Sequence, residues 1–166
     1  MIKIAIVEDE AMYAKQLEEF LHQYEKENGE AFDITIYSDG DQIVNKYQSQ
    51  YDIILMDVEM KFMDGMSAAE EIRKVDTEVV IIFITNMAQY AIRGYAVDAL
   101  DYILKPVSYF AFSQRLSRAI GRMKKRRDKD DHGQHERRDG ADQYRKYLLY
   151  RKPGAYADPA HNSWRL

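Results

Sequence analysis

IKIAIVEDE, at residues 2–10, is a short run rich in β-branched apolar residues that ends in three acids. Such a run predicts a buried β-strand. Directly after it, apolar residues recur at helical spacing as far as Asn28 and Gly29. A helix is expected to end there, because glycine readily adopts the left-handed conformation of a helix C-cap. The N-terminus therefore predicts a strand followed by an amphipathic helix.

The same order of elements repeats along the chain. Strands are expected at residues 32–37, 52–56, 79–84 and 100–104, and helices at residues 42–47, 67–75, 89–95 and 108–123. Strands that alternate with helices over short connections form parallel sheets, because parallel neighbours need a crossover. The sequence predicts an α/β, doubly wound fold with a five-stranded parallel sheet covered on both faces. In such folds the ligand site lies at the carboxyl ends of the strands.

Length and composition exclude several classes of protein. The 166 residues, of which 46% are hydrophobic, suffice for one core of ordinary size. The absence of cysteine excludes disulfides, thiolate metal sites and cysteine nucleophiles, and favours a reducing compartment. Neither a signal peptide nor a run of ~18 apolar residues is present, so no membrane partner is expected. The expected location is cytoplasmic.

Charge divides the chain into two parts. Residues 1–124 hold 13 Lys and Arg against 21 Asp and Glu, a net charge of −8, whereas residues 125–166 hold 11 against 7, a net charge of +4. The acidic part argues against nucleic acid as its direct ligand. Among Val, Ile, Leu, Met and Phe, the second part contains only Leu148, Leu149 and Leu166, too few for a core. We expect one domain over residues 1–124 and a basic, disordered tail over residues 125–166.

Polar residues follow four of the predicted strands: the acids at 8–10, then Asp57, Thr85 and Lys105. They are expected at one edge of the sheet. Carboxylates so close repel one another unless a cation intervenes, and an all-oxygen site suits Mg²⁺, with Asp9 and Asp57 as ligands. Carboxylates, Mg²⁺ and a nearby lysine match the needs of phosphoryl transfer.

Ordinary structural interpretations compete with this hypothesis. A lone Asp at a strand end is usually a turn or cap residue, and a Lys before Pro106 is usually solvated. Tyr102 fits a half-buried strand aromatic. The phosphate loops GxGxxG and GxxxxGK[ST] are absent. Two alternative functions stay open: a small Mg²⁺-dependent phosphohydrolase that uses Asp57 as its nucleophile, and a flavodoxin-like FMN-binding module.

Four strings, IVEDE, LMDVEMKFMDG, IIFITN and DALDYILKPV, resemble in order and spacing the receiver domain of two-component response regulators over roughly residues 1–124. The resemblance implies a flavodoxin-like fold with strand order 2-1-3-4-5. It implies that Asp57 accepts a phosphoryl group from a sensor histidine kinase, and that Glu8, Asp9, Asp57 and the main-chain carbonyl of Glu59 hold Mg²⁺. Such a domain is a phosphoacceptor and not an enzyme, limited to self-phosphorylation from phosphodonors and slow autodephosphorylation.

The resemblance also implies a switch. Thr85 and Lys105 would contact the phosphoryl group, and Tyr102 would rotate inward and repack the surface of the fourth helix, fifth strand and fifth helix. That surface would serve a phosphorylation-dependent homodimer or another partner. Pro106, as a cis residue, and Gly65 would shape the turns at the site.

The string ITNMAQYAIRGYAVDALDYILKPV is similar to the LytTR subfamily, whose members control transcription through a C-terminal DNA-binding domain. Residues 125–166 do not read as such a domain, so DNA contact is expected only through a domain that is absent or scrambled here. The string YLLYRKPGAY can be encoded so that a reading one base later gives IYYIESQGH, which resembles a LytTR segment. A frameshift near residue 130 is one interpretation; a natural linker and a nonspecific nucleic-acid arm are the others.

Overall fold

The computed structural model describes the backbone of residues 1–149, and the side chains of residues 1–129 except those of Tyr90, Ile92, Arg93 and Tyr95. Its strands are β1 (Ile2–Val7), β2 (Phe32–Tyr37), β3 (Ile53–Met56), β4 (Val80–Thr85) and β5 (Asp101–Leu104). Its α-helices are α1 (Ala11–Asn28), α2 (Gly40–Asn45), α3 (Gly65–Val75), α4 (Ala91–Gly94) and α5 (Tyr109–Leu149). Two 3₁₀ turns, η1 (Ala88–Tyr90) and η2 (Tyr95–Val97), flank α4.

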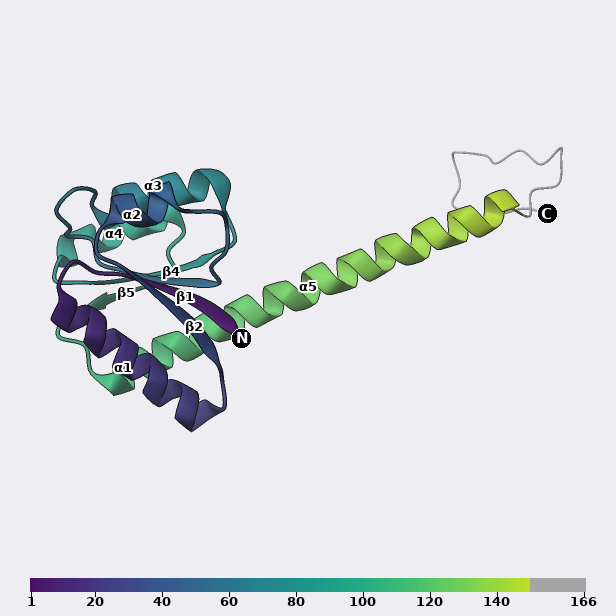
Figure 1. The fold of residues 1–166 in the computed structure, drawn as a ribbon. Coiled ribbons are helices and arrows are strands. Elements are labelled where there is room, and N and C mark those ends of the chain that lie inside the picture. Colours follow the sequence, from purple (N-terminus) through teal and green to yellow (C-terminus); the bar gives the residue numbers. More distant parts are fainter. Residues whose placement is uncertain (150–166) are drawn as a thin grey trace. The chain divides into compact units, whose positions relative to one another are not determined.

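The five strands form one parallel sheet in the order β2-β1-β3-β4-β5, which confirms the predicted fold class and strand order. In Figure 1, α1 and the first part of α5 cover one face of the sheet, and α2, α3 and α4 cover the other. Because both faces are covered, each strand must be apolar on both sides. Burial of both faces explains why the strands appear in the sequence as continuous apolar runs.

Alternate residues along each strand pack in two separate hydrophobic cores, one on each face of the sheet. Ile4 and Ile6 of β1 point toward the face of α1 and α5, and Ala5 and Val7 point toward the face of α2 and α3. This alternation follows from the two-residue period of a strand. Phe83 of β4 is fully buried in the second core. The sheet is therefore packed on both faces, which fixes the positions of the strand ends at its carboxyl edge.

Helix ends follow local sequence signals. Gly29 adopts φ 68° and donates its N–H to Glu25 O, so α1 ends at Asn28 as predicted. Asp39 and Asp64 are the N-caps of α2 and α3. The single helix predicted at residues 89–95 is wrong in form, because the structure has one short α-helical turn between two 3₁₀ turns. Gly94 lies within this segment and lowers its helix propensity.

The last helix is longer than predicted. The predicted helix ends at residue 123, whereas α5 continues to Leu149, over a stretch that contains no proline. A first compact unit spans Met1–Lys125. The interpretations of residues 125–166 stay predictions, and residues 150–166 lie outside the described part. In the part of the chain that the structure describes, no helix has the length and apolarity needed to cross a membrane.

Candidate functional site

Main-chain hydrogen bonds carry the pattern of the sheet one residue past the strand ends and fix the backbone of the site. They run from Glu8 N to Tyr37 O, from Asp57 N to Val7 O and from Lys105 N to Thr85 O, each 2.9 Å long. Three residues far apart in sequence are thereby placed on one edge. The backbone atoms that carry their side chains are therefore fixed by the sheet.

The acidic side chains converge at this edge. One carboxylate oxygen from each of Glu8, Asp9 and Asp57 lies within 4.8 Å of the other two. Glu8 and Asp57 are buried, whereas Asp9 is exposed, so the cluster opens to solvent at Asp9. Three oxygen ligands on one side are the donor set that Mg²⁺ prefers, with water or a phosphoryl group on the other side. The residues fit the predicted ion.

Lys105 lies inside the acidic cluster. Its Nζ donates to Glu8 Oε2 at 2.7 Å and to Asp57 Oδ2 at 2.9 Å, and its side chain is 1% exposed. Burial lowers the pKa of Lys105, but the hydrogen bonds to Glu8 and Asp57 outweigh it and leave the pKa above its ordinary value. The lysine is therefore a permanent cation beside Asp57.

Glu8 has an unusual acidity. Burial raises its pKa to about 7, although the hydrogen bonds from Lys105 Nζ and from Glu10 N lower it and the nearby charge of Asp57 raises it further. Without a metal ion beside Lys105, Glu8 therefore holds a proton at weakly acidic pH. A second positive charge is needed to ionise all three acids.

Tyr13 of α1 covers the ammonium from another side. Its ring centroid lies 4.1 Å from Lys105 Nζ, a cation–π distance. No role for Tyr13 could be predicted from the sequence, because no short motif links a residue in the first turn of a helix to a lysine that follows the last strand. Only the sheet topology brings the two together.

The loop after Asp57 is shaped by close backbone contacts. Glu59 N donates to Asp57 Oδ1 at 3.3 Å, and Gly65 N donates to Val58 O at 2.8 Å. Asp39, at the end of β2, accepts from Phe62 N at 2.9 Å and from Met63 N at 2.8 Å. The loop is thus tied at both ends. Sequence reasoning named Gly65 and Glu59 but missed Asp39.

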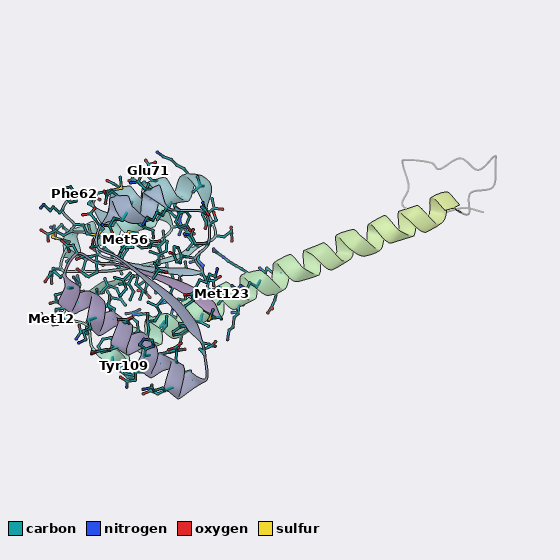
Figure 2. All side chains as sticks on the ribbon, viewed as in Figure 1. Met12, Met56, Phe62, Glu71, Tyr109 and Met123 are labelled. Carbon is teal, nitrogen blue, oxygen red and sulfur yellow. The ribbon has the colours of Figure 1, made fainter. Side chains whose placement is uncertain are left out.

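Pro106 follows Lys105, and the peptide bond between them is cis. Figure 2 shows the exposed side chains of Met12 and Phe62 at the edge of the sheet where the strands end, beyond the α1 and α3 faces respectively.

Thr85 and Tyr102 meet at one residue, Met87. Met87 N donates to Thr85 Oγ1 at 3.2 Å, and the Tyr102 hydroxyl donates to Met87 O. Tyr102 also packs on Phe83, with ring centroids 6.0 Å apart. Thr85 is fully buried. The hydroxyls of Thr85 and Tyr102 are therefore connected through the backbone of a single residue, Met87.

Comparison with known proteins places these residues in a family. The chain matches the family described as response regulator receiver domain over residues 4–117. It is 30% identical over 126 residues to the sensory transduction protein LytR of Streptococcus agalactiae, which covers 75% of this chain and 48% of the relative. It is 32% identical over 139 residues to LytT of Oceanobacillus iheyensis, covering 78% and 54%. The chain spans about half the length of the curated relatives it matches.

Solved structures show the same fold. The response regulatory domain of MrkE from Klebsiella pneumoniae aligns with a TM-score of 0.68 and 25% identity, over 75% of this chain and 99% of that one. The receiver domain of the sensor histidine kinase PA1611 from Pseudomonas aeruginosa, described with a magnesium ion in its active site cleft, aligns with a TM-score of 0.62 and 31% identity, over 72% and 98%.

Proposed function

Because the chain belongs to the response regulator receiver domain family of two-component systems, we propose that Asp57 accepts a phosphoryl group from a sensor histidine kinase. The observation that carries this proposal is the Asp57 carboxylate, buried at the end of β3 with Lys105 Nζ at 2.9 Å and Glu8 and Asp9 beside it. The resemblance to LytTR regulators is confirmed by the LytR and LytT relatives. The hydrolase and flavin alternatives find no support in these comparisons.

Glu8, Asp9, Asp57 and the main-chain carbonyl of Glu59 would hold Mg²⁺. When bound, the ion neutralises the acids and the charge on the phosphoryl oxygens. Two further observations support this assignment: the three carboxylates converge, and burial keeps the pKa of Glu8 near 7 while no second cation is present.

The proposed transfer uses one oxygen of Asp57 as the nucleophile. It forms a bond to phosphorus while the phosphorus–nitrogen bond of the donor phosphohistidine breaks, and the electron pair stays on the imidazole nitrogen, which takes a proton from water. Lys105 donates hydrogen bonds to the phosphoryl oxygens. With a small phosphodonor the same groups would support self-phosphorylation, and slow attack of water would return Asp57 to its free form.

The proposed effect of phosphorylation on the surface follows from the hydrogen bonds that join Thr85 and Tyr102 through Met87. If the Thr85 hydroxyl turns toward a new phosphoryl group, it gives up its bond from Met87 N, and the peptide that Tyr102 holds becomes free to move. We propose that this change repacks the surface formed by α4, β5 and α5. The surface would then serve a homodimer or another partner.

A role in transcription is proposed from the relatives, of which the chain spans about half for LytR of Streptococcus agalactiae and 32% for the transcriptional regulatory protein LytR of Staphylococcus aureus. Residues 1–124 carry a net charge of −8, which disfavours DNA as a direct ligand of the receiver. Control of transcription would need a further DNA-binding segment. We propose the cytoplasm as the site of action, where a sensor kinase presents its phosphohistidine.

Intact-protein mass after incubation with Mg²⁺ and acetyl phosphate tests the proposal. The native chain should gain one phosphate, Asp57→Ala should gain none, and a chelator should abolish the gain. Glu71→Ala is the matched control, because Glu71 lies on the outer side of α3 in a surface pair with Lys74 (Figure 2) and should leave the gain intact. A native chain without a phosphate adduct would contradict the proposal.

A further inference from the structure

We propose that Tyr13 is a positioning residue for Lys105. The Tyr13 ring would hold the Lys105 ammonium in the site when Glu8 and Asp57 bind a metal ion. The inference rests on the proposed phosphoryl transfer and assigns a role to a residue outside the acidic cluster. The features that carry it are the distances around Lys105 Nζ, the burial of the lysine and the place of Tyr13 in α1.

Three groups surround the ammonium. Glu8 Oε2 lies at 2.7 Å, Asp57 Oδ2 at 2.9 Å and the ring centroid of Tyr13 at 4.1 Å from Lys105 Nζ. An ammonium has three N–H donors, and the two carboxylates use two of them. The face of the ring occupies a further side. Lys105 is 1% exposed, so the contact lies in a desolvated place, where a cation over an aromatic ring is attracted most strongly.

A neutral ring and a carboxylate differ in their effect on the net charge around Lys105. A further carboxylate in the place of the Tyr13 ring would offset the charge of Lys105 and repel an incoming phosphoryl group. The ring attracts the ammonium through its quadrupole and carries no net charge, so the positive charge stays available. Tyr13 can therefore fix Lys105 without competing with the phosphoryl oxygens.

The contact matters most when a cation is bound. In the proposed function, Glu8 and Asp57 share their oxygens with the ion, which weakens both of their bonds to Lys105. Tyr13 is not among the ligands, so its contact with the ammonium does not depend on the ion. Without the ring, the ammonium stays between Glu8 and Asp57 and competes with the ion for their oxygens. Loss of the ring should therefore weaken cation binding as well as phosphoryl transfer.

A purely structural role fits Tyr13 less well. The core on this face of the sheet takes Ala14, Leu17, Leu21 and Tyr24 from α1, together with the partly buried Phe20, and Tyr13 is not a member of it. Tyr13 is half-buried. Replacing it should therefore remove little of the apolar surface that holds α1 to the sheet.

The test compares Tyr13→Phe, Tyr13→Leu and the control Phe20→Leu, which shortens an aromatic of α1 that packs against Tyr109 and Phe112 instead. The first measurement is the NMR shift of the Lys105 ε-methylene group, assigned by its loss in Lys105→Arg. A ring face above Nζ should shift this signal upfield in the native chain and in Tyr13→Phe, with and without Mg²⁺, and Tyr13→Leu should abolish the shift.

The second measurement is affinity for Mg²⁺ alone and the initial rate of phosphorylation by acetyl phosphate. Both should fall about ten-fold in Tyr13→Leu, and stay near native in Tyr13→Phe and Phe20→Leu. An unshifted Lys105 signal in the native chain, or native Mg²⁺ affinity in a folded Tyr13→Leu, would overturn the inference. The NMR shift and the Mg²⁺ affinity need no phosphoryl transfer, so they decide the role of Tyr13 even if Asp57 accepts nothing. If Tyr13→Leu does not fold, the shift in the native chain decides it.

Discussion

Gly65 and Asp57 approach so closely that a Cβ added to Gly65 would lie 2.0 Å from the carbonyl oxygen of Asp57. It would also lie 2.9 Å from the Asp57 carbonyl carbon and 3.0 Å from Val58 Cα. All three atoms belong to the backbone, so no side-chain rotation relieves the contact. The first residue of α3 thus packs directly on the peptide of the proposed phosphoacceptor.

Gly65→Ala should lower the free energy of unfolding by about 3 kcal/mol and slow phosphorylation, because the strand end that carries Asp57 must shift. Urea unfolding and the acetyl phosphate rate measure the two effects. Gly121→Ala is the matched control: a Cβ at Gly121, in α5, meets nothing within 4 Å, and the change should stabilise the protein by about 0.5–1 kcal/mol. Equal effects of the two substitutions would contradict the close approach.

Mg²⁺ affinity should depend on pH through Glu8. Burial raises its pKa from 4.5 to about 7, so the metal-free protein must release a proton to bind the ion below that pH. The apparent Kd should fall as pH rises from about 5.5 to 7 and level off above. Titration calorimetry in two buffers of different ionisation enthalpy measures the proton released.

Glu8→Gln supplies the control for this pH dependence. It should bind Mg²⁺ more weakly at every pH, with a flatter profile between pH 5.5 and 8. Without metal, the raised pKa means that the contribution of Glu8 to stability is present below pH 4.5 and is lost as pH rises toward 7. Equal native affinity at pH 5.5 and 8 would rule out the assignment.

Asp39→Ala should destabilise the protein by about 2 kcal/mol, because it leaves Phe62 N and Met63 N without their acceptor. Burial alone would raise the pKa of Asp39, but the main-chain donors outweigh it and hold the pKa below 3.8. The stability from its charge is therefore present above pH 3.8 and is lost as pH falls through the lower folded pKa.

Asp39→Asn separates charge from shape. The difference in unfolding free energy between the native chain and this variant should be larger at pH 7 than at pH 3, in urea titrations. A difference that grows in acid would show that the carboxylate is not the stabilising form.

Arg73→Ala should lower the free energy of unfolding by about 2 kcal/mol. Its guanidinium donates to four main-chain carbonyls, those of Asp76, Val79, Val97 and Asp98. The bonds to Val97 and Asp98 tie α3 to the connection before β5, where Asp98 has φ 48°, and those to Asp76 and Val79 hold the connection before β4. Arg73→Lys should recover only part of the loss, since one ammonium cannot reach all four acceptors.

The control is Lys74→Ala, because Lys74 forms only a surface pair with Glu71. It should change the free energy of unfolding by less than about 0.5 kcal/mol in the same unfolding assay.

Strong local signals made the fold predictable. Apolar runs mark β1 and β4 because both faces of a parallel sheet are buried, and Gly29 marks the end of α1. The convergence of Glu8, Asp57 and Lys105 followed from topology alone. The family comparisons then agreed with the predicted class.

The rest depended on contacts that sequence spacing does not encode. Tyr13 reaches Lys105, and Asp39 reaches the loop at Phe62, across elements whose relative placement only the fold determines. Gly94 and the short turns around α4 have no strong periodicity, so one helix was predicted where three pieces exist. The end of α5 was missed because the apolar periodicity ends at Met123, whereas the helix continues through charged residues that have no apolar stripe.

The ion pair between Glu8 and Lys105 closes a loop of 97 residues, from the end of the first strand to the end of the last. Closing so long a loop costs chain entropy, which is recovered only when every intervening strand is in place. A fragment that stops before β5 lacks Lys105, so Glu8 and Asp57 gain their ammonium partner only when the chain is complete through residue 105.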